Sequence, residues 1–186
     1  MKKSLTKEQT TFRNSTVLKE DGVFISNAGI VVLHPCLNQF FKRQKLVDEG
    51  EFITIEDKKK AIFLLHFLSS GEKQAEEHQL VIPKILCDFP VEEPIEKAVD
   101  LSEAEIAEAM DLLTAAIQQW EILKETSIEG LRTSFLQRGG KLLIKKDKLV
   151  LQVETSSIDL LLDHLPWNLS IIKLPWMKEI IWVEWR

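Results

Sequence analysis

The stretch 139-GGKLLIKKDKLVLQVE-154 decides the fold class, because the pattern of apolar residues changes there. After the two glycines, apolar and polar side chains alternate on both sides of a short polar turn, which is typical of a β-hairpin. Leu149, Leu151 and Val153 fall on one face of its second strand. The hairpin therefore predicts a β-sheet in the last third of the chain.

The segment before this hairpin contains the clearest helix signal of the sequence. Ser102 and Glu105 have the spacing of a capping box, in which each side chain accepts a hydrogen bond from the other residue's backbone N–H. Apolar residues then follow at spacings of four and three as far as Trp120. This pattern predicts one long helix that ends near Lys124.

Weaker signals of the same kind predict shorter helices elsewhere. Pro35 suits the first turn of a helix that runs to about Leu46, because its missing N–H is not needed there. Asp57 is expected to cap a helix that Gly71 terminates. Further helices are expected at residues 76–89, at residues 127–138 behind a second capping box of Thr126 and Glu129, and after Ser157.

Two more strands are expected near the C-terminus, at residues 169–174 and 179–185. Helices thus come first and strands last, which favours an α+β fold. In this fold the helical N-terminal two-thirds pack on a small antiparallel β-sheet formed by the C-terminal third. Residues 1–24 are polar and are expected to form a flexible arm, and residues 25–186 a single α+β domain.

The composition argues against several classes of partner and location. A net charge of −5 disfavours a nucleic-acid partner, which would require a basic face. No run of 18 apolar residues occurs, and no apolar stretch follows the N-terminal lysines, so we expect neither a membrane span nor a secretory signal. Two cysteines are too few for a disulfide framework. We therefore expect a cytoplasmic protein.

Residue types used in catalysis and metal binding occur without the spacing that their chemistry requires. The close pairs of a zinc site are missing among the candidate ligands His34, Cys36, His66, His78, Cys87 and His164. Both cysteines lie among apolar neighbours, where thiols pack rather than react, although a Cys–His pair formed in space stays an alternative. Glycine motifs that bind phosphates or nucleotides are absent. We expect no enzyme, no cofactor and no metal.

Tryptophan is concentrated at the C-terminal end of the sequence. The range 163–186 contains four of the five, namely Trp167, Trp176, Trp182 and Trp185. One interpretation is that the rings wrap the hydrophobic core. The other is that they form an interface, because tryptophan anchors dominate buried contacts between proteins. Alternation along the last strand places Trp182 on the face opposite to its neighbours, and Trp182 is therefore the candidate exposed ring.

Several segments resemble the characteristic domain of the contractile injection system tape measure proteins, which belong to phage-tail-like particles. The resemblance spans residues 25–186 and closes on Val-Glu-Trp, and it rests on the segments 27-NAGIVVLHPCL-37, 77-EHQLVIPKILCDFPVEEPI-95, 126-TSIEGLRTSFLQRGGKL-142 and 165-LPWNLSIIKLPWM-177. It implies a structural part in particle assembly and brings no catalytic residues with it.

The resemblance also implies partners and a place of action. A tape measure protein lies along the lumen of the growing inner tube and sets its length, but a chain of this size is expected to lack the long helical ruler. We therefore expect it to set tube length or to dock on tube or baseplate proteins, in the cytoplasm during assembly and then within the particle. The alternative is a chaperone or adaptor that binds a particle subunit before assembly, and self-association is left open.

The expected partner-binding residues come from two parts of the chain. They are the aromatic tail and the turn that opens the first motif, namely Trp167, Trp176, Trp182, Trp185, Asn27 and Gly29.

Overall fold

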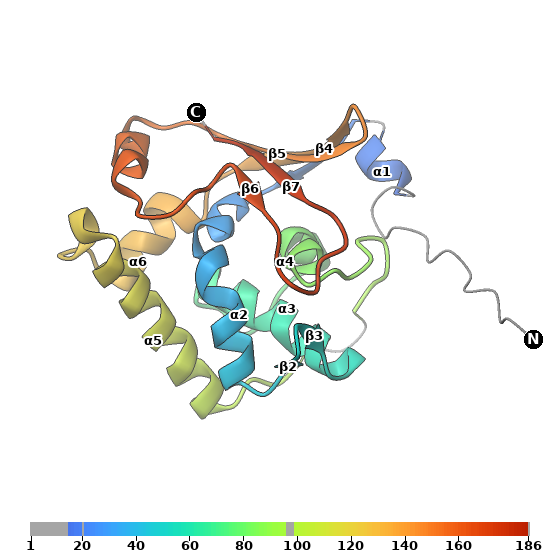
Figure 1. Cartoon of the computed structure of the whole chain (residues 1–186), viewed down its shortest axis with the longest axis horizontal. Helices are drawn as coiled ribbons and strands as arrows, with labels where there is room; N and C mark the ends of the chain where they lie inside the picture. The colour runs from blue at the N-terminus through green and yellow to red at the C-terminus, as the bar shows by residue number, and fades with distance from the viewer. Residues whose placement is uncertain (1–14, 20, 96–98, 186) are drawn as a thin grey trace, which may run out of the picture.

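The computed structural model describes residues 15–19, 21–95 and 99–185, and these form a mixture of helices and strands (Figure 1). The α-helices are α1 (Thr16–Lys19), α2 (His34–Arg43), α3 (Ile55–Ser70), α4 (Val81–Leu86), α5 (Glu103–Gln119) and α6 (Ile128–Leu131). Shorter 3-10 or π segments are η1 (Ala28–Leu33), η2 (Glu77–Leu80), η3 (Glu121–Leu123), η4 (Arg132–Leu136) and η5 (Ser157–His164). The strands are β1 (Val23–Ile25), β2 (Val47–Asp48), β3 (Glu51–Phe52), β4 (Gly140–Lys145), β5 (Lys148–Val153), β6 (Ile171–Ile172) and β7 (Ile181–Glu184).

The main sheet has five strands in the order β1-β4-β5-β7-β6, and β2 and β3 form a separate hairpin. The predicted hairpin is present as β4 and β5. Its two turn residues, Lys146 and Asp147, have φ angles of 50° and 60°, the positive values that a two-residue type I′ turn requires. β7 lies beside β5 and parallel to it, with Val183 opposite Leu151. The sheet is therefore mixed.

Two parts of the predicted sheet are wrong. The sheet is not purely antiparallel, because after η5 the chain runs back along the sheet in β6, and β7 then runs in the direction of β5 and pairs with it in parallel. Nor does the C-terminal third form it alone, because β1 pairs with β4 and places Val23 opposite Leu142. A strand of three residues is too short for its alternation to be recognised in the sequence.

The same strand limits the flexible arm that was expected over residues 1–24. Leu18 on α1 is fully buried, and Phe24 lies opposite Lys141 in the sheet. Residues 15–19 and 21–24 therefore belong to the folded part of the chain. Residues 1–14 lie outside the described residues.

Local chemistry explains where the long helix begins and where it ends. The predicted capping box is confirmed, because the Ser102 hydroxyl accepts from the Glu105 N–H at 3.2 Å and Glu105 Oε2 accepts from the Ser102 N–H at 2.8 Å. The helix ends at Gln119, before the predicted end at Lys124. Trp120 leaves the helical conformation because its buried ring packs on Phe135, with 4.7 Å between ring centroids.

Two other helix starts differ from the prediction by one to three residues. Thr54, rather than Asp57, caps α3, since its hydroxyl accepts from the Asp57 N–H. Ser127 caps α6 in the same way, so the capping box expected from the residue before it does not form. The predicted end of α3 is confirmed, with Gly71 in the left-handed conformation at φ 82°.

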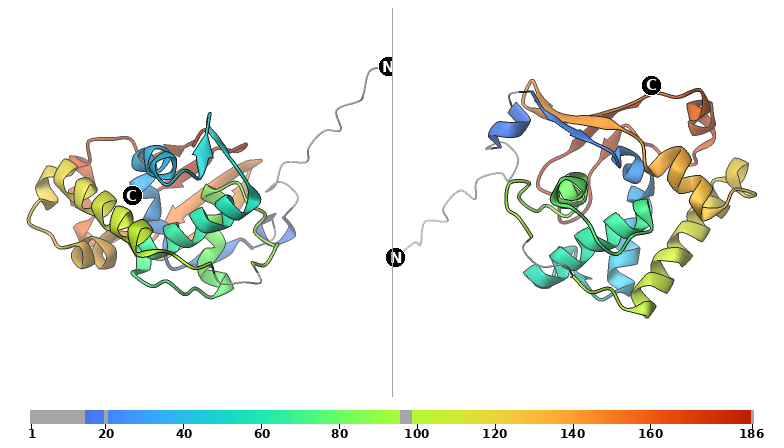
Figure 2. Two further views of the ribbon diagram at one scale, coloured as in Figure 1. Left: turned by 90° about the horizontal axis from the view of Figure 1, so that it is seen from below. Right: turned by 180° about the vertical axis from the view of Figure 1, so that it is seen from behind.

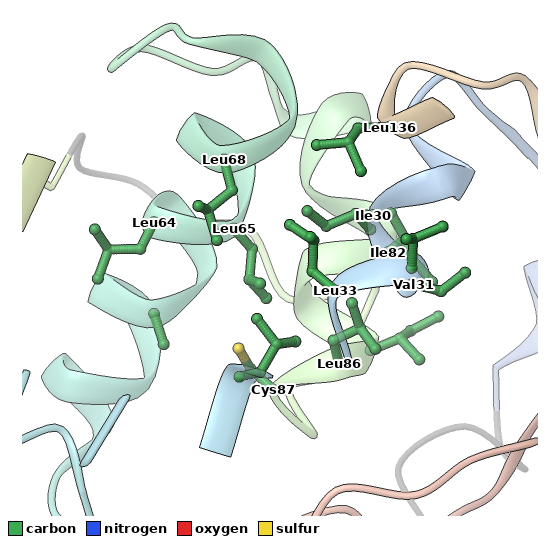
Figure 3. Close-up of a cluster of buried hydrophobic side chains, with 14 of the residues drawn as sticks. Ile30, Val31, Leu33, Leu64, Leu65, Leu68, Ile82, Leu86, Cys87 and Leu136 are labelled. Atoms are coloured by element: carbon green, nitrogen blue, oxygen red, sulfur yellow. The ribbon is translucent and has the colours of Figure 1, made fainter. Parts of the chain in front are cut away.

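The core lies between the helices and one face of the main sheet. Figure 3 shows side chains of η1 and α4 gathered together, with side chains of α3 facing them from the other side. All six residues of η1 are buried. The sheet contributes Leu142, Leu151 and Ile181, each with 0% of its surface exposed. In Figure 1 the main sheet lies in the upper part of the molecule, and α2, α3 and α5 lie below it. The right panel of Figure 2 shows the same arrangement from behind.

Candidate functional site

The outward side of the main sheet carries apolar side chains in register across four strands. Leu143 on β4 lies opposite Val150 on β5, Val150 opposite Trp182 on β7, and Trp182 opposite Ile171 on β6. Cross-strand partners point to the same side of a sheet, so these four residues form one continuous line, here called the apolar row. Ile171 is 44% exposed and Trp182 is half-buried. Val150 is only 4% exposed, so the outward apolar surface comes from Leu143, Trp182 and Ile171.

Lysines flank the apolar row on the side of the hairpin turn. Lys145 and Lys148 lie opposite each other on β4 and β5, and Lys146 occupies the turn. The Lys148 ammonium lies 4.0 Å from the centroid of the Trp182 ring, which is a cation–π contact. Together with Trp182 and Ile171, the three lysines line a hollow of about 330 Å³. The hollow combines an apolar floor with a basic rim.

The opposite flank of the apolar row is polar but not basic throughout. Lys141, Gln152 and Glu184 lie in register across β4, β5 and β7. The Gln152 amide donates to Glu184 Oε2 at 2.8 Å, and Lys145 lies 3.6 Å from Glu184 Oε1. The hydrogen bond from Gln152, with a smaller contribution from the Lys145 charge, holds the pKa of Glu184 below its ordinary value. The carboxylate therefore stays ionised at neutral pH.

The four C-terminal tryptophans occupy different environments, and Trp176 belongs to the core. It is 3% exposed and its indole N–H donates to the Leu86 carbonyl at 2.7 Å. Its ring centroid lies 5.6 Å from that of Phe41 and 4.9 Å from that of Phe52. The position of Trp176 therefore supports the interpretation that this ring is part of the core.

Trp167 and Trp185 are half-buried at the other end of β6 and β7. The Trp167 indole donates to the Val32 carbonyl at 3.0 Å, and the Trp185 indole donates to Asp159 Oδ2 at 3.2 Å. Both rings line a hollow of about 300 Å³ that is separate from the one at Trp182. Their N–H groups already have partners within the chain, so these rings tie the C-terminal segment to the fold.

Asn27 and Gly29 are buried and lie at neither hollow of the tail. The Asn27 amide donates to the Gln79 carbonyl at 2.9 Å. A Cβ atom on Gly29 would lie 1.6 Å from the backbone oxygen of Phe135, so only glycine fits where η1 passes η4. The structure thus brings Trp182 alone, of the six expected residues, onto the apolar row.

The alternation of apolar and polar residues in the hairpin was the sequence signal from which the other residues of the apolar row could have been found. The sequence placed Leu149, Leu151 and Val153 on one face, and so left Val150 and Leu143 for the other. Val150, Leu143 and Ile171 were not among the predicted site residues, because the neighbours of each strand are set by tertiary pairing and not by the local sequence pattern.

Four of the six candidate ligands and nucleophiles, His34, Cys36, His66 and Cys87, are partly or fully buried, whereas His78 and His164 are exposed. In the described ranges, no three His, Cys, Asp or Glu side chains gather in a way that could hold a metal ion. His34 Nε2 lies 2.9 Å from the Asn168 carbonyl and His66 Nε2 lies 2.9 Å from the Gln74 carbonyl. Burial lowers the pKa of both imidazoles and raises the pKa of both cysteine thiols, Cys36 and Cys87.

A family model described as contractile injection system tape measure protein matches residues 1–185. The chain belongs to this family. The match confirms the resemblance found in the motifs and extends it to the segment that forms α1 and β1. The tape measure family consists of structural components of contractile injection systems and is not a known enzyme family.

Comparison of this tape measure family member with curated proteins and with solved structures gave no match. Among its described helices, none has both the length and the apolar character needed to cross a membrane.

Proposed function

We propose that the chain is a docking component of a contractile injection particle and binds a tube or baseplate protein through the outer face of its main sheet. The observation that carries this proposal is the apolar row with Trp182 at its centre. Tryptophan is the residue type most enriched among the side chains that dominate binding energy. Such anchors are surrounded by a polar rim that excludes water, which is the position that the flanking lysines and Glu184 occupy.

The shape of the described residues supports docking rather than measuring as their direct task. A ruler must be extended, and an α-helix gains about 1.5 Å per residue. The longest helix, α5, has 17 residues and therefore spans only about 25 Å. The elements around it fold back on one another. An effect on tube length would accordingly be exerted from the point at which this domain is anchored.

The proposal is tested by capturing a tagged copy expressed together with its particle genes, with mass spectrometry and electron microscopy of what is retained. Two substitutions form a matched pair: Ile171→Ala on the apolar row and Ile122→Ala on η3, since these isoleucines are 44% and 46% exposed. We expect Trp182→Ala and Ile171→Ala to reduce the retained tube or baseplate protein, and Ile122→Ala to leave it unchanged.

The result also separates this role from that of a chaperone or adaptor. A docking component is retained in finished particles, whereas a chaperone is captured with one soluble subunit and is absent from them. If the three variants retain the same partners in the same amounts as the wild type, the outer sheet face is not the docking surface.

A further inference from the structure

We infer that the element seated on the apolar row is an amphipathic α-helix of the partner protein, with carboxylates along the flank that faces the hairpin turn. This inference rests on the proposed docking function and specifies the chemistry of the partner. It follows from the direction and spacing of the row and from the charges beside it.

The row runs across the strands rather than along them, because its four members are cross-strand partners. Neighbouring strands lie about 4.8 Å apart, so the row is about 14 Å long. A helix repeats its contacting side chains every turn of about 5.4 Å, and about three turns match that length. An extended segment would place side chains on one face about 6.8 Å apart, so that one of them would fall between the two central strands. The spacing therefore favours a helix laid across the strands.

The charges set the orientation of this helix. Lys145, Lys146 and Lys148 gather on one flank of a chain whose net charge is −5. Within the part of the chain that the structure describes, no carboxylate lies within 4.0 Å of Lys146 or Lys148, and Lys145 approaches Glu184 only at 3.6 Å. On the other flank Glu184 is already bonded by Gln152. The unmatched positive charge thus lies on the hairpin side, where the partner's carboxylates complete the pairing.

The same charges disfavour a second copy of this chain as the occupant. An identical outer face would bring the same three lysines against only two carboxylates, Asp147 of the turn and Glu184, and Glu184 accepts from Gln152 already. Nucleic acid fits the lysines but not the exposed apolar surface of Leu143, Trp182 and Ile171, which would lose water without gaining a complementary apolar partner. A helix with an apolar stripe and an acidic flank satisfies both parts of the surface.

The seating of the helix is tested by photo-crosslinking in cells that express the particle genes. A photoreactive amino acid replaces Ile171 in one variant and Ile122 in the control. We expect the first variant to crosslink to a helical segment of a tube or baseplate protein that is rich in Asp or Glu, and the control to give no such product. Crosslinks to an extended segment, to a second copy or to nucleic acid would overturn the inference.

The outcomes also distinguish failure of the inference from failure of the docking function. If the wild type captures tube or baseplate protein but position 171 crosslinks to none of it, docking uses another surface. In that case the inferred partner helix is refuted, and the docking function is not. If the wild type captures neither protein, the proposed function fails and the inference fails with it.

The orientation is tested with a synthetic peptide of the crosslinked segment in a binding titration. The variant Lys145→Glu/Lys148→Glu is compared with Lys42→Glu/Lys124→Glu, which changes the net charge equally at two exposed lysines on other elements. We expect about a tenfold loss of affinity for the first pair and less than a twofold loss for the second. Equal losses of affinity in the two double variants would show that only the net charge of the protein affects binding. That result would refute the acidic flank of the partner helix.

Discussion

Trp176→Ala offers the sharpest test of the division between core and surface tryptophans. The ring packs between Phe41 and Phe52, and its indole N–H donates to the carbonyl of Leu86. Replacement by alanine removes the ring and leaves that buried carbonyl without its donor. Because Trp176 is 3% exposed, the loss falls almost entirely on the folded state.

The expected magnitude follows from buried area and from the hydrogen bond. A buried tryptophan removes up to about 250 Å² from water, and about 25 cal/mol per Å² gives an upper value near 6 kcal/mol. Part of the cavity collapses, and truncations of buried aromatic residues lower the free energy of unfolding by about 3–5 kcal/mol. We expect about 4 kcal/mol for Trp176→Ala. Trp176→Phe keeps most of the area but loses the N–H, and is expected to cost about 1–2 kcal/mol.

Urea denaturation followed by far-ultraviolet circular dichroism measures both values, because the signal does not depend on the substituted tryptophan. The transition midpoint should fall while the denaturant slope stays constant. For a chain of this size, the loss in Trp176→Ala corresponds to a melting temperature lower by about 10 °C.

Trp182→Ala is the control, because its ring lies on the outer face under Lys148. We expect it to lower the free energy of unfolding by about 1 kcal/mol, well below the loss in the buried variant, while reducing partner capture. If Trp182→Ala destabilises the protein as much as Trp176→Ala, or if the buried variant loses less than about 1.5 kcal/mol, the division is wrong.

Three further predictions concern stability. Gly29→Ala should lower the free energy of unfolding by about 4 kcal/mol or more and reduce the soluble yield, because its Cβ would lie 1.6 Å from the Phe135 oxygen. Arg132→Met should cost about 2–4 kcal/mol in the same urea assay, since the guanidinium donates to the buried carbonyls of Phe67 and Leu68 at the end of α3; a loss below about 1 kcal/mol would contradict this. Burial lowers the pKa of His66 below its ordinary 6.5, so the unfolded state binds the proton more readily and stability should fall as the pH drops below about 6.5. His66→Gln should flatten that fall between about pH 7 and 5, and an unchanged slope would assign it to other groups.

The parts of the fold that could be predicted from the sequence are those whose structure is determined by residues close together in the chain. The capping box at Ser102, the terminating Gly71 and the hairpin at residues 140–153 depend on hydrogen bonds and turns within a few positions. The end of α5 depends instead on Trp120 meeting Phe135, and the place of β7 depends on its pairing with β5. Neither contact is encoded in a local pattern.

The candidate site divides in the same way. Alternation along β7 correctly separated Trp182 from Ile181, because it is a property of one strand. That Val150 lies beside Trp182 requires the parallel pairing of β5 with β7, whereas the sheet as a whole was predicted to be antiparallel. That Trp176 is core requires Phe41 and Phe52, which lie more than a hundred positions away. Tryptophan content alone does not distinguish these roles.

The place of β7 within the main sheet has a consequence for synthesis of the protein. On the nascent chain, β5 has β4 on one side and an open edge on the other until residue 184 has left the ribosome. The line of apolar side chains then lacks both Trp182 and Ile171, since β6 pairs only with β7. Under the proposed docking function, a chain that lacks β7 would not present the surface that the partner binds. On that proposal, binding of the partner depends on the pairing of β7 with both β5 and β6.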